Sequence, residues 1–206
     1  INADNDVTIG GNVGGNIEAN WSVSVKGSVG GDIIADDSLT VGGNVDGNVE
    51  ADEISVGGNV GGDVNCSGNL NVDGNVDGNV EADGEVTVAG SVGGDLEANG
   101  DATIRGSIGG DANCDGSFLC DGSVGGDVEC SGDATIRGSV GGDVHCDGDL
   151  IIGKTSSRIR VEGDIECGKN CTIYGDALGD VSVDFDLMLG GKVNGDLEVG
   201  GKVKKI

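Results

Sequence analysis

Aspartates recur at one fixed place in this sequence and are the first candidates for cation chemistry. Each follows a glycine, and from residue 95 onward the position is always Asp, at Asp95, Asp111, Asp127, Asp143, Asp164, Asp180 and Asp196. Carboxylate oxygens are preferred ligands of hard cations, but a column of carboxylates also repels itself. Two interpretations follow. Backbone amides stabilise each carboxylate, which we favour, or the first four aspartates bind cations weakly.

Cysteines share another fixed position, where they alternate with alanine, at Cys66, Cys114, Cys130, Cys146 and Cys167. A buried free Cys behaves as a small apolar residue, so we interpret this column, and Cys120, as core filler. Stacked Cα atoms about 4.8 Å apart also lie within disulfide range, which leaves a bridge open. Cys167 and Cys171 form C-G-K-N-C, but no second Cys or His pair completes a zinc site.

Nothing else in the sequence assembles a catalytic set. His145 is the only histidine, and we expect it to point outward without the partner that general base catalysis needs. We predict no catalytic residue, no cofactor and no resident metal. An enzyme built on a β-helix would need clustered bases or aromatic residues, and the chain has one Trp and one Tyr.

The sequence GKTSSRIR interrupts an otherwise acidic chain with Lys154, Arg158 and Arg160. This basic segment could bind a protein partner, or it could be an insertion that the surface tolerates.

Most of these residues occupy fixed positions of a sequence repeat, and the fold of that repeat decides where they lie. We number the repeat so that Val86 is position 1 and Asp101 is position 16. Position 7 is then a valine or its equivalent, which recurs every 16 residues from Val13 to Val140. One interval is a residue short, and five residues are inserted before Val161. Within each unit, apolar and polar residues alternate, which indicates extended strands with one buried face.

A chain that is extended everywhere and repeats in register predicts an all-β, single-stranded parallel β-helix, or β-solenoid, of about twelve coils. Glycine at the corners suits positive φ and leaves the turn uncrowded, and Asn or Asp beside it can bind backbone amides. We expect one domain over residues 1–206, with a lead-in at 1–6, regular coils at 7–153, an inserted loop at 154–160 and C-terminal coils at 161–206.

The net charge and its distribution limit which classes of partner the chain can bind. The net charge is −26, which argues against nucleic acid because phosphates would be repelled. No stretch approaches eighteen apolar residues, so we expect no membrane insertion. Residues 1–150 carry net −25, and residues 151–206 carry net −1. The C-terminal end, with Phe185, Leu187, Leu189 and Ile206, therefore looks less solvated, and its strand edge invites pairing with another chain.

The phrases GNVGGNIEAN, GSVGGDVECSG, GKVNGDLEVGGKV and VEGDIECGKNCTIYGDALGDV resemble the bactofilins, a polymer-forming bacterial cytoskeletal family. The resemblance implies a right-handed parallel β-helix in the cytoplasm that polymerises end to end without nucleotide. Family polymerisation uses apolar residues of the terminal coils, which here match Phe185, Leu187 and Leu189.

The function that we expect is structural. The chain would be a self-associating acidic scaffold, a homo-oligomer or filament formed through the solenoid ends. The alternative is a β-helical stalk or adhesin-like module of a cell-surface protein, which would place it outside the cell.

Overall fold

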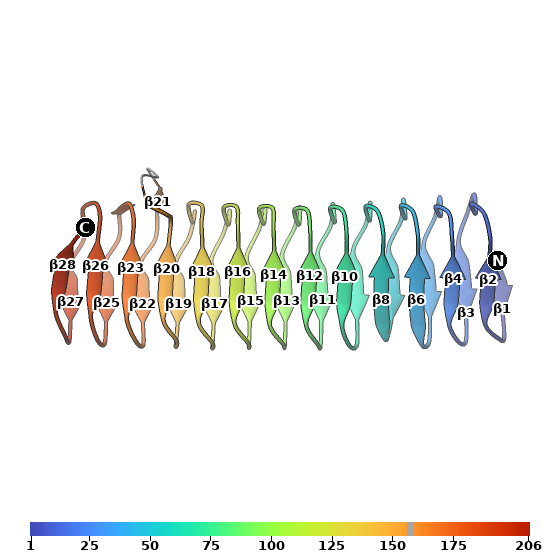
Figure 1. Cartoon of the computed structure of the whole chain (residues 1–206), viewed down its shortest axis with the longest axis horizontal. Coiled ribbons are helices and arrows are strands. Elements are labelled where there is room, and N and C mark those ends of the chain that lie inside the picture. Colours follow the sequence, from blue (N-terminus) through green and yellow to red (C-terminus); the bar gives the residue numbers. More distant parts are fainter. Residues whose placement is uncertain (156–158) are drawn as a thin grey trace.

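The computed structural model describes residues 1–155 and 159–206 and is a straight β-solenoid (Figure 1). Each coil contributes one strand to each of two parallel sheets of thirteen strands. Sheet A contains β1 (Asn2–Ala3), β3 (Ile17–Ala19), β5 (Ile33–Ala35), β7 (Val49–Ala51), β9 (Val64–Cys66), β11 (Val80–Ala82), β13 (Leu96–Ala98), β15 (Ala112–Cys114), β17 (Val128–Cys130), β19 (Val144–Cys146), β22 (Ile165–Cys167), β25 (Val181–Val183) and β27 (Leu197–Val199).

Sheet B lies on the other side of the core. It contains β2 (Val7–Ile9), β4 (Val23–Val25), β6 (Ser38–Val41), β8 (Glu53–Val56), β10 (Leu70–Val72), β12 (Val86–Val88), β14 (Ala102–Ile104), β16 (Phe118–Cys120), β18 (Ala134–Ile136), β20 (Leu150–Ile152), β23 (Cys171–Ile173), β26 (Leu187–Leu189) and β28 (Val203–Lys205). The predicted all-β parallel solenoid is confirmed, with about thirteen turns because the partial coils at both ends also pair.

Register follows the sequence period. Leu96 of β13 lies beside Ala112 of β15, sixteen residues later, and backbone hydrogen bonds continue past the strand ends into the corners. For example, the N–H of Leu96 donates to the carbonyl of Asp111 at 2.9 Å. Because each coil bonds only to its two neighbours, cohesion along the rod is the sum of coil-to-coil interfaces.

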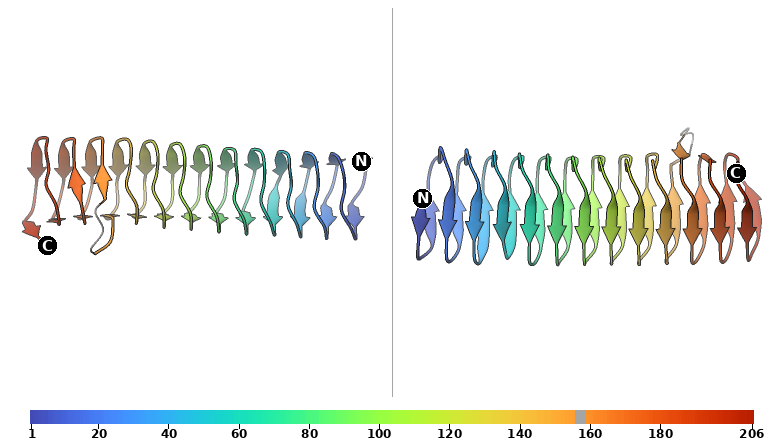
Figure 2. Two further views of the ribbon diagram at one scale, coloured as in Figure 1. Left: turned by 90° about the horizontal axis from the view of Figure 1, so that it is seen from above. Right: turned by 180° about the vertical axis from the view of Figure 1, so that it is seen from behind.

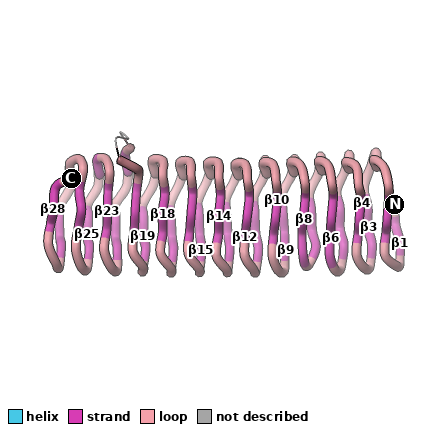
Figure 3. The backbone as a smooth tube through the Cα atoms, in the orientation of Figure 1, coloured by secondary structure: helices cyan, strands magenta, loops and turns pink. Residues whose placement is uncertain are grey.

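The third side of each coil is not a sheet. There, single bridges link position 7 from Val13 through Val161. A short pair, β21 (Arg160–Val161) with β24 (Asp176–Ala177), follows the insertion. The tube trace shows the same loop, strand, loop, strand order in the regular turns (Figure 3), and the turns with β21 and β24 add a third short strand.

The core is a stack of five inward side chains per coil. In the coil that begins at Val86 these are Val86, Val88, Val92, Leu96 and Ala98, each at most 2% exposed. Small β-branched and short residues fill this narrow space, and the outward residues between them are exposed or half-buried. The strict alternation in the sequence is therefore the inside-outside alternation of the strands.

Of the two reasons that the sequence suggested for the corner glycines, the lack of a crowding side chain applies widely and positive φ does not. Gly153, at φ 83°, is the only glycine recorded at positive φ among the described residues. Most of the others are needed because neighbouring coils approach closely. A β-carbon on Gly110 would overlap the Oδ1 atom of Asp95, and one on Gly126 would overlap Asp111. The expectation of positive φ at these corners is wrong, and the expectation that glycine avoids crowding is confirmed, because close stacking excludes a side chain.

Residues 1–6 do more than lead into the first coil, because Asn2 and Ala3 already pair with Glu18 and Ala19. After β20 the chain departs at a corner from the otherwise even outline of the rod, and β21 lies on this projection (Figure 1 and Figure 2). Across the described ranges 1–155 and 159–206, no helix is long and apolar enough to cross a membrane.

We predict that Gly110→Ala lowers the free energy of unfolding by about 1–3 kcal/mol, because the added methyl must displace the Asp95 carboxylate or part the coils. Gly15→Ala is the matched control, since nothing lies within 4 Å of a β-carbon at that equivalent position. Urea unfolding followed by circular dichroism measures both. Equal losses in the two variants would contradict the close-stacking explanation.

Candidate functional site

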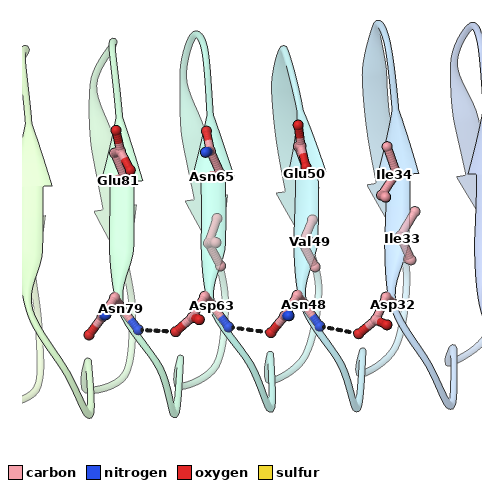
Figure 4. A pocket seen from close by; sticks show the side chains of 11 residues that line it. Asp32, Ile33, Ile34, Asn48, Val49, Glu50, Asp63, Asn65, Asn79 and Glu81 are labelled. Atoms are coloured by element: carbon pink, nitrogen blue, oxygen red, sulfur yellow. Dashed lines mark hydrogen bonds between the residues drawn. The ribbon is translucent and has the colours of Figure 1, made fainter.

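The aspartate column of the sequence lies at the corner that precedes each sheet A strand. Its side chains form an unbroken hydrogen-bond ladder with the backbone, in which each residue's N–H donates to Oδ1 of its equivalent one coil earlier. The bonds run from Asn16 to Asp196 with N–O distances of 2.7–3.1 Å. Figure 4 shows four steps of this ladder, Asp32, Asn48, Asp63 and Asn79.

This ladder accounts for the carboxylates without a cation. Oδ1 of Asp95 accepts from the N–H of Asp111 at 2.9 Å, and Oδ1 of Asp111 accepts from Asp127 at 2.8 Å. In the part of the chain that the structure describes, no three His, Cys, Asp or Glu side chains gather to hold a metal ion. Corner capping is therefore present, and weak cation binding at Asp95, Asp111, Asp127 and Asp143 stays a prediction.

Side chains at two further corners accept the same coil-to-coil backbone hydrogen bond, and these caps were not predicted from the sequence. Position 6 caps with Asn or Ser, as in Ser123, whose Oγ accepts from the N–H of Ser139 at 3.0 Å. Position 16 caps with Asp or Asn, as in Asp133, which accepts from Asp149 at 2.9 Å. Arg160 takes position 6 where the insertion rejoins the rod, and a guanidinium cannot accept a hydrogen bond.

A groove follows the outer face of sheet A between position 10 and position 12. In the N-terminal half it is lined by Asn48, Asp63 and Asn79 on one side and by Glu50 and Glu81 on the other (Figure 4). These oxygens and amides are solvated and face an open strip, and the groove holds no nucleophile paired with a base. Its geometry fits a wet flank of the rod better than a reaction site.

His145 lies on the same face and is surrounded by carboxylates. Its Nδ1 lies 3.2 Å from Oε2 of Glu166, and its Nε2 lies 3.2 Å from Oδ1 of Asp147. Slight burial lowers the pKa of the imidazole, but the hydrogen bonds and charges of Glu166 and Asp147 outweigh burial and raise it. The sequence placed His145 outward correctly and missed these two partners.

All seven cysteines are free and buried. The thiols at position 13 reach corner carbonyls; the Sγ of Cys114 lies 3.1 Å from the carbonyl oxygen of Gly100. Burial raises the pKa of Cys120 to about 11, and the Cys167 thiol together with burial raises the pKa of Cys171. At Cys120 and Cys171 these surroundings disfavour the reactive thiolate. Hydrogen bonds with the Cys130 and Cys171 thiols instead lower the pKa of Cys114, Cys146 and Cys167. The complete burial of all seven side chains agrees with a core-filling role.

The predicted basic segment is only partly described. Lys154 and Arg160 are exposed on either side of the insertion, whereas Arg158 lies outside the described residues. Their use as a protein contact stays a prediction.

The residues expected to mediate self-association separate into two groups. Phe185 and Ile206 are 58% and 48% exposed, but Leu187 and Leu189 are 0% and 2% exposed. Leu187 and Leu189 occupy inward positions of β26 and are covered by β28. The sequence missed Leu197 and Val203, which occupy inward positions of the last coil and are 45% and 49% exposed.

Comparison with known families decides the relationship. A family model described as bactofilin, polymer-forming cytoskeletal, matches residues 1–67, 53–120 and 118–204. The chain belongs to the bactofilin family. No curated protein matches the bactofilin chain, and no solved structure matches it.

The three matches overlap and together cover nearly all of this bactofilin. Each corresponds to several coils, and the structure shows no break in either sheet between them. The family pattern therefore restarts along one continuous rod. The family is polymer-forming and structural. This agrees with the described surface residues, whose side chains form caps and hydrogen-bond ladders between coils.

We predict that Asp111→Ala lowers the free energy of unfolding by about 1 kcal/mol, because the N–H of Asp127 loses its acceptor. Asp111→Asn keeps the acceptor, removes a like charge from the column, and should leave stability unchanged or slightly higher. Asn48 and Asn79 already fill this position. Urea unfolding with and without a chelator measures both variants. A loss in Asp111→Asn that equals the loss in Asp111→Ala and disappears when the chelator is present would favour cation binding.

We also predict that His145 titrates above its ordinary pKa of 6.5 in the folded protein. A raised folded pKa means that the stabilising contribution is fully present below pH 6.5 and is lost as pH rises through the folded value. NMR titration of the imidazole protons measures this pKa. Glu166→Gln should move it toward 6.5, and an unchanged value in that variant would disprove the contribution of Glu166.

Proposed function

We propose that this bactofilin is a non-catalytic scaffold rod that associates with further copies through its solenoid ends to form cytoplasmic filaments. The family match supports a structural, polymer-forming role. The bare net charge of −26 disfavours nucleic acid as a partner, and the rod needs no nucleotide for the stacking that holds its own coils together.

The observation that carries the end-to-end mode is the last coil of the structure. Leu197 and Val203 repeat the positions of Val181 and Leu187, which are 1% and 0% exposed. The two end residues are 45% and 49% exposed because β27 and β28 pair on one side only. An open strand edge backed by apolar side chains is a template for pairing with another chain.

A second copy stacked on this edge would continue both sheets. At the other end, β1 and β2 also pair on one side only, and Ile1 is 57% exposed. Joining the two would bury apolar surface at roughly 25 cal/mol per Å² and would supply backbone partners to strands that lack them.

The test is electron microscopy of the purified protein and of Leu197→Lys. We expect filaments from the parent chain and their loss in Leu197→Lys, because a charged side chain on the open edge opposes stacking. Ile34→Lys, at an exposed residue on the flank of sheet A (42% exposed), is the control and should retain filaments. Leu189→Lys is unsuitable because it would place a charge in the core.

Filaments that persist in Leu197→Lys would overturn the end-to-end mode. A strictly monomeric parent protein at high concentration would overturn polymerisation and favour the β-helical stalk or adhesin-like module of a cell-surface protein.

A further inference from the structure

The outer face of sheet B changes character along the rod. Position 2, the central outward position of each strand, is Thr or Ser over most of the N-terminal half. In β16 to β26 it becomes Leu119, Thr135, Ile151, Thr172 and Met188. Ile151 and Met188 are 40% and 37% exposed, Leu119 and Thr135 are half-buried, and Thr172 is buried at 9% exposure. We call these five residues the sheet B stripe.

Charges of opposite sign border this stripe. On one edge, position 16 supplies the exposed residues Asp101, Asp133, Asp149 and Asp186. On the other edge, position 4 supplies the exposed residues Arg105 and Arg137, with the half-buried Asp121 between them. The stripe is therefore an apolar centre with an acidic edge and a basic edge, which the sequence repeats place on the same strands.

The two edges match within single coils. Asp101 and Arg105 flank β14, and Asp133 and Arg137 flank β18. Arg137 already forms an ion pair with Asp121 of the preceding coil, so the basic edge is partly ordered in the single rod. Because all coils are in register, these charged pairs recur at defined steps along the axis.

We infer that the sheet B stripe binds the same stripe of a second copy, with the two rods parallel and in register. A two-fold axis parallel to the rods places the acidic edge of one copy opposite the basic edge of the other. Asp101 then faces Arg105 of the second copy, and Asp133 faces Arg137, each pair occurring twice. Sheets packed face to face lie about 10 Å apart, a distance that these side chains can span.

Charge selects this arrangement over the antiparallel one. Turning one rod end for end would place the acidic edge opposite the other acidic edge, with like charges of Asp133, Asp149 and Asp186 in proximity. Opposed like charges at an interface suppress the wrong pairing. The same argument disfavours the sheet A face as a self-association surface, because its outward position 12 carries Glu81, Glu97 and Glu129.

The footprint implies modest strength for one pair. Six coils at about 4.8 Å and four residues across at about 3.3 Å per residue give roughly 380 Å² per copy, below the roughly 800 Å² typical of stable complexes. This lateral contact does not require end-to-end stacking. Where rods are also joined through their ends, as proposed above, many such contacts act together and strengthen pairing of filaments.

Cross-linking tests the orientation directly. Thr103→Cys and Thr135→Cys place accessible thiols at position 2 of two coils, while the native cysteines are buried. A bis-maleimide spanning about 10 Å, matched to the sheet spacing, should link both variants to themselves. An antiparallel pair brings only one coil opposite its own copy, so only one variant, or neither, would react. Asn113→Cys, on the outer face of sheet A, is the control and should give no cross-linked dimer.

Substitution tests the stripe itself. Ile151→Lys in the Thr135→Cys background should reduce the cross-linked yield by at least about tenfold, the effect of losing roughly 1.4 kcal/mol. Ile34→Lys, similarly exposed on the opposite sheet, should leave the yield unchanged. Equal effects of the two substitutions, or absence of cross-linking in both threonine variants, would overturn the inference.

The two modes of association are separable by experiment. Leu197→Lys should abolish filaments and keep the Thr135→Cys cross-link. Ile151→Lys should keep single filaments and reduce the cross-link. Loss of filaments in Leu197→Lys with no cross-link in any variant would uphold the proposed function and reject the lateral contact.

Discussion

Close, uniform stacking of one coil on the next is the constraint on which this structure depends. Neighbouring strands in a sheet lie about 4.8 Å apart, and that spacing must hold at the corners as well as in the strands. Two residue types meet the requirement together. An Asn, Asp or Ser side chain bonds to the amide of the following coil, and the glycine beside it leaves room for that side chain. The abundance of glycine, and of Asp and Asn at these corner positions, has this cause.

The same constraint explains why the surface offers so little for catalysis. Outward residues repeat every coil, so most side chains are flanked by residues of similar type. Carboxylates become neighbours of carboxylates, as at Glu81 and Glu97; His145, which lies between Glu129 and Glu166, is an exception. A repeating surface of this kind suits repeated contacts with an equally repeating partner, which is what a polymer-forming family requires.

The fold could be predicted from the sequence because the spacing of residues such as Val92, Ile108 and Val124 directly reports the strand register. The association surface was harder. Leu187 and Leu189 look like surface candidates in the sequence, yet β28 covers them. Burial at a solenoid end depends on how many coils follow, not on residue type. Likewise, Ile151 and Met188 stand out as apolar surface residues only when the position 2 residues of successive sheet B strands are compared.

Overlap of the three family matches has a consequence for how such a chain changes in evolution. Since every coil presents the same donors, acceptors and core residues to the next, a duplication or loss of one 16-residue unit would leave two compatible surfaces to rejoin. Rod length is then a heritable quantity adjustable in increments of about 4.8 Å. The coil shortened by one residue between Ala51 and Ile54, where β6 and β8 still pair in register, shows that even imperfect units can be accommodated.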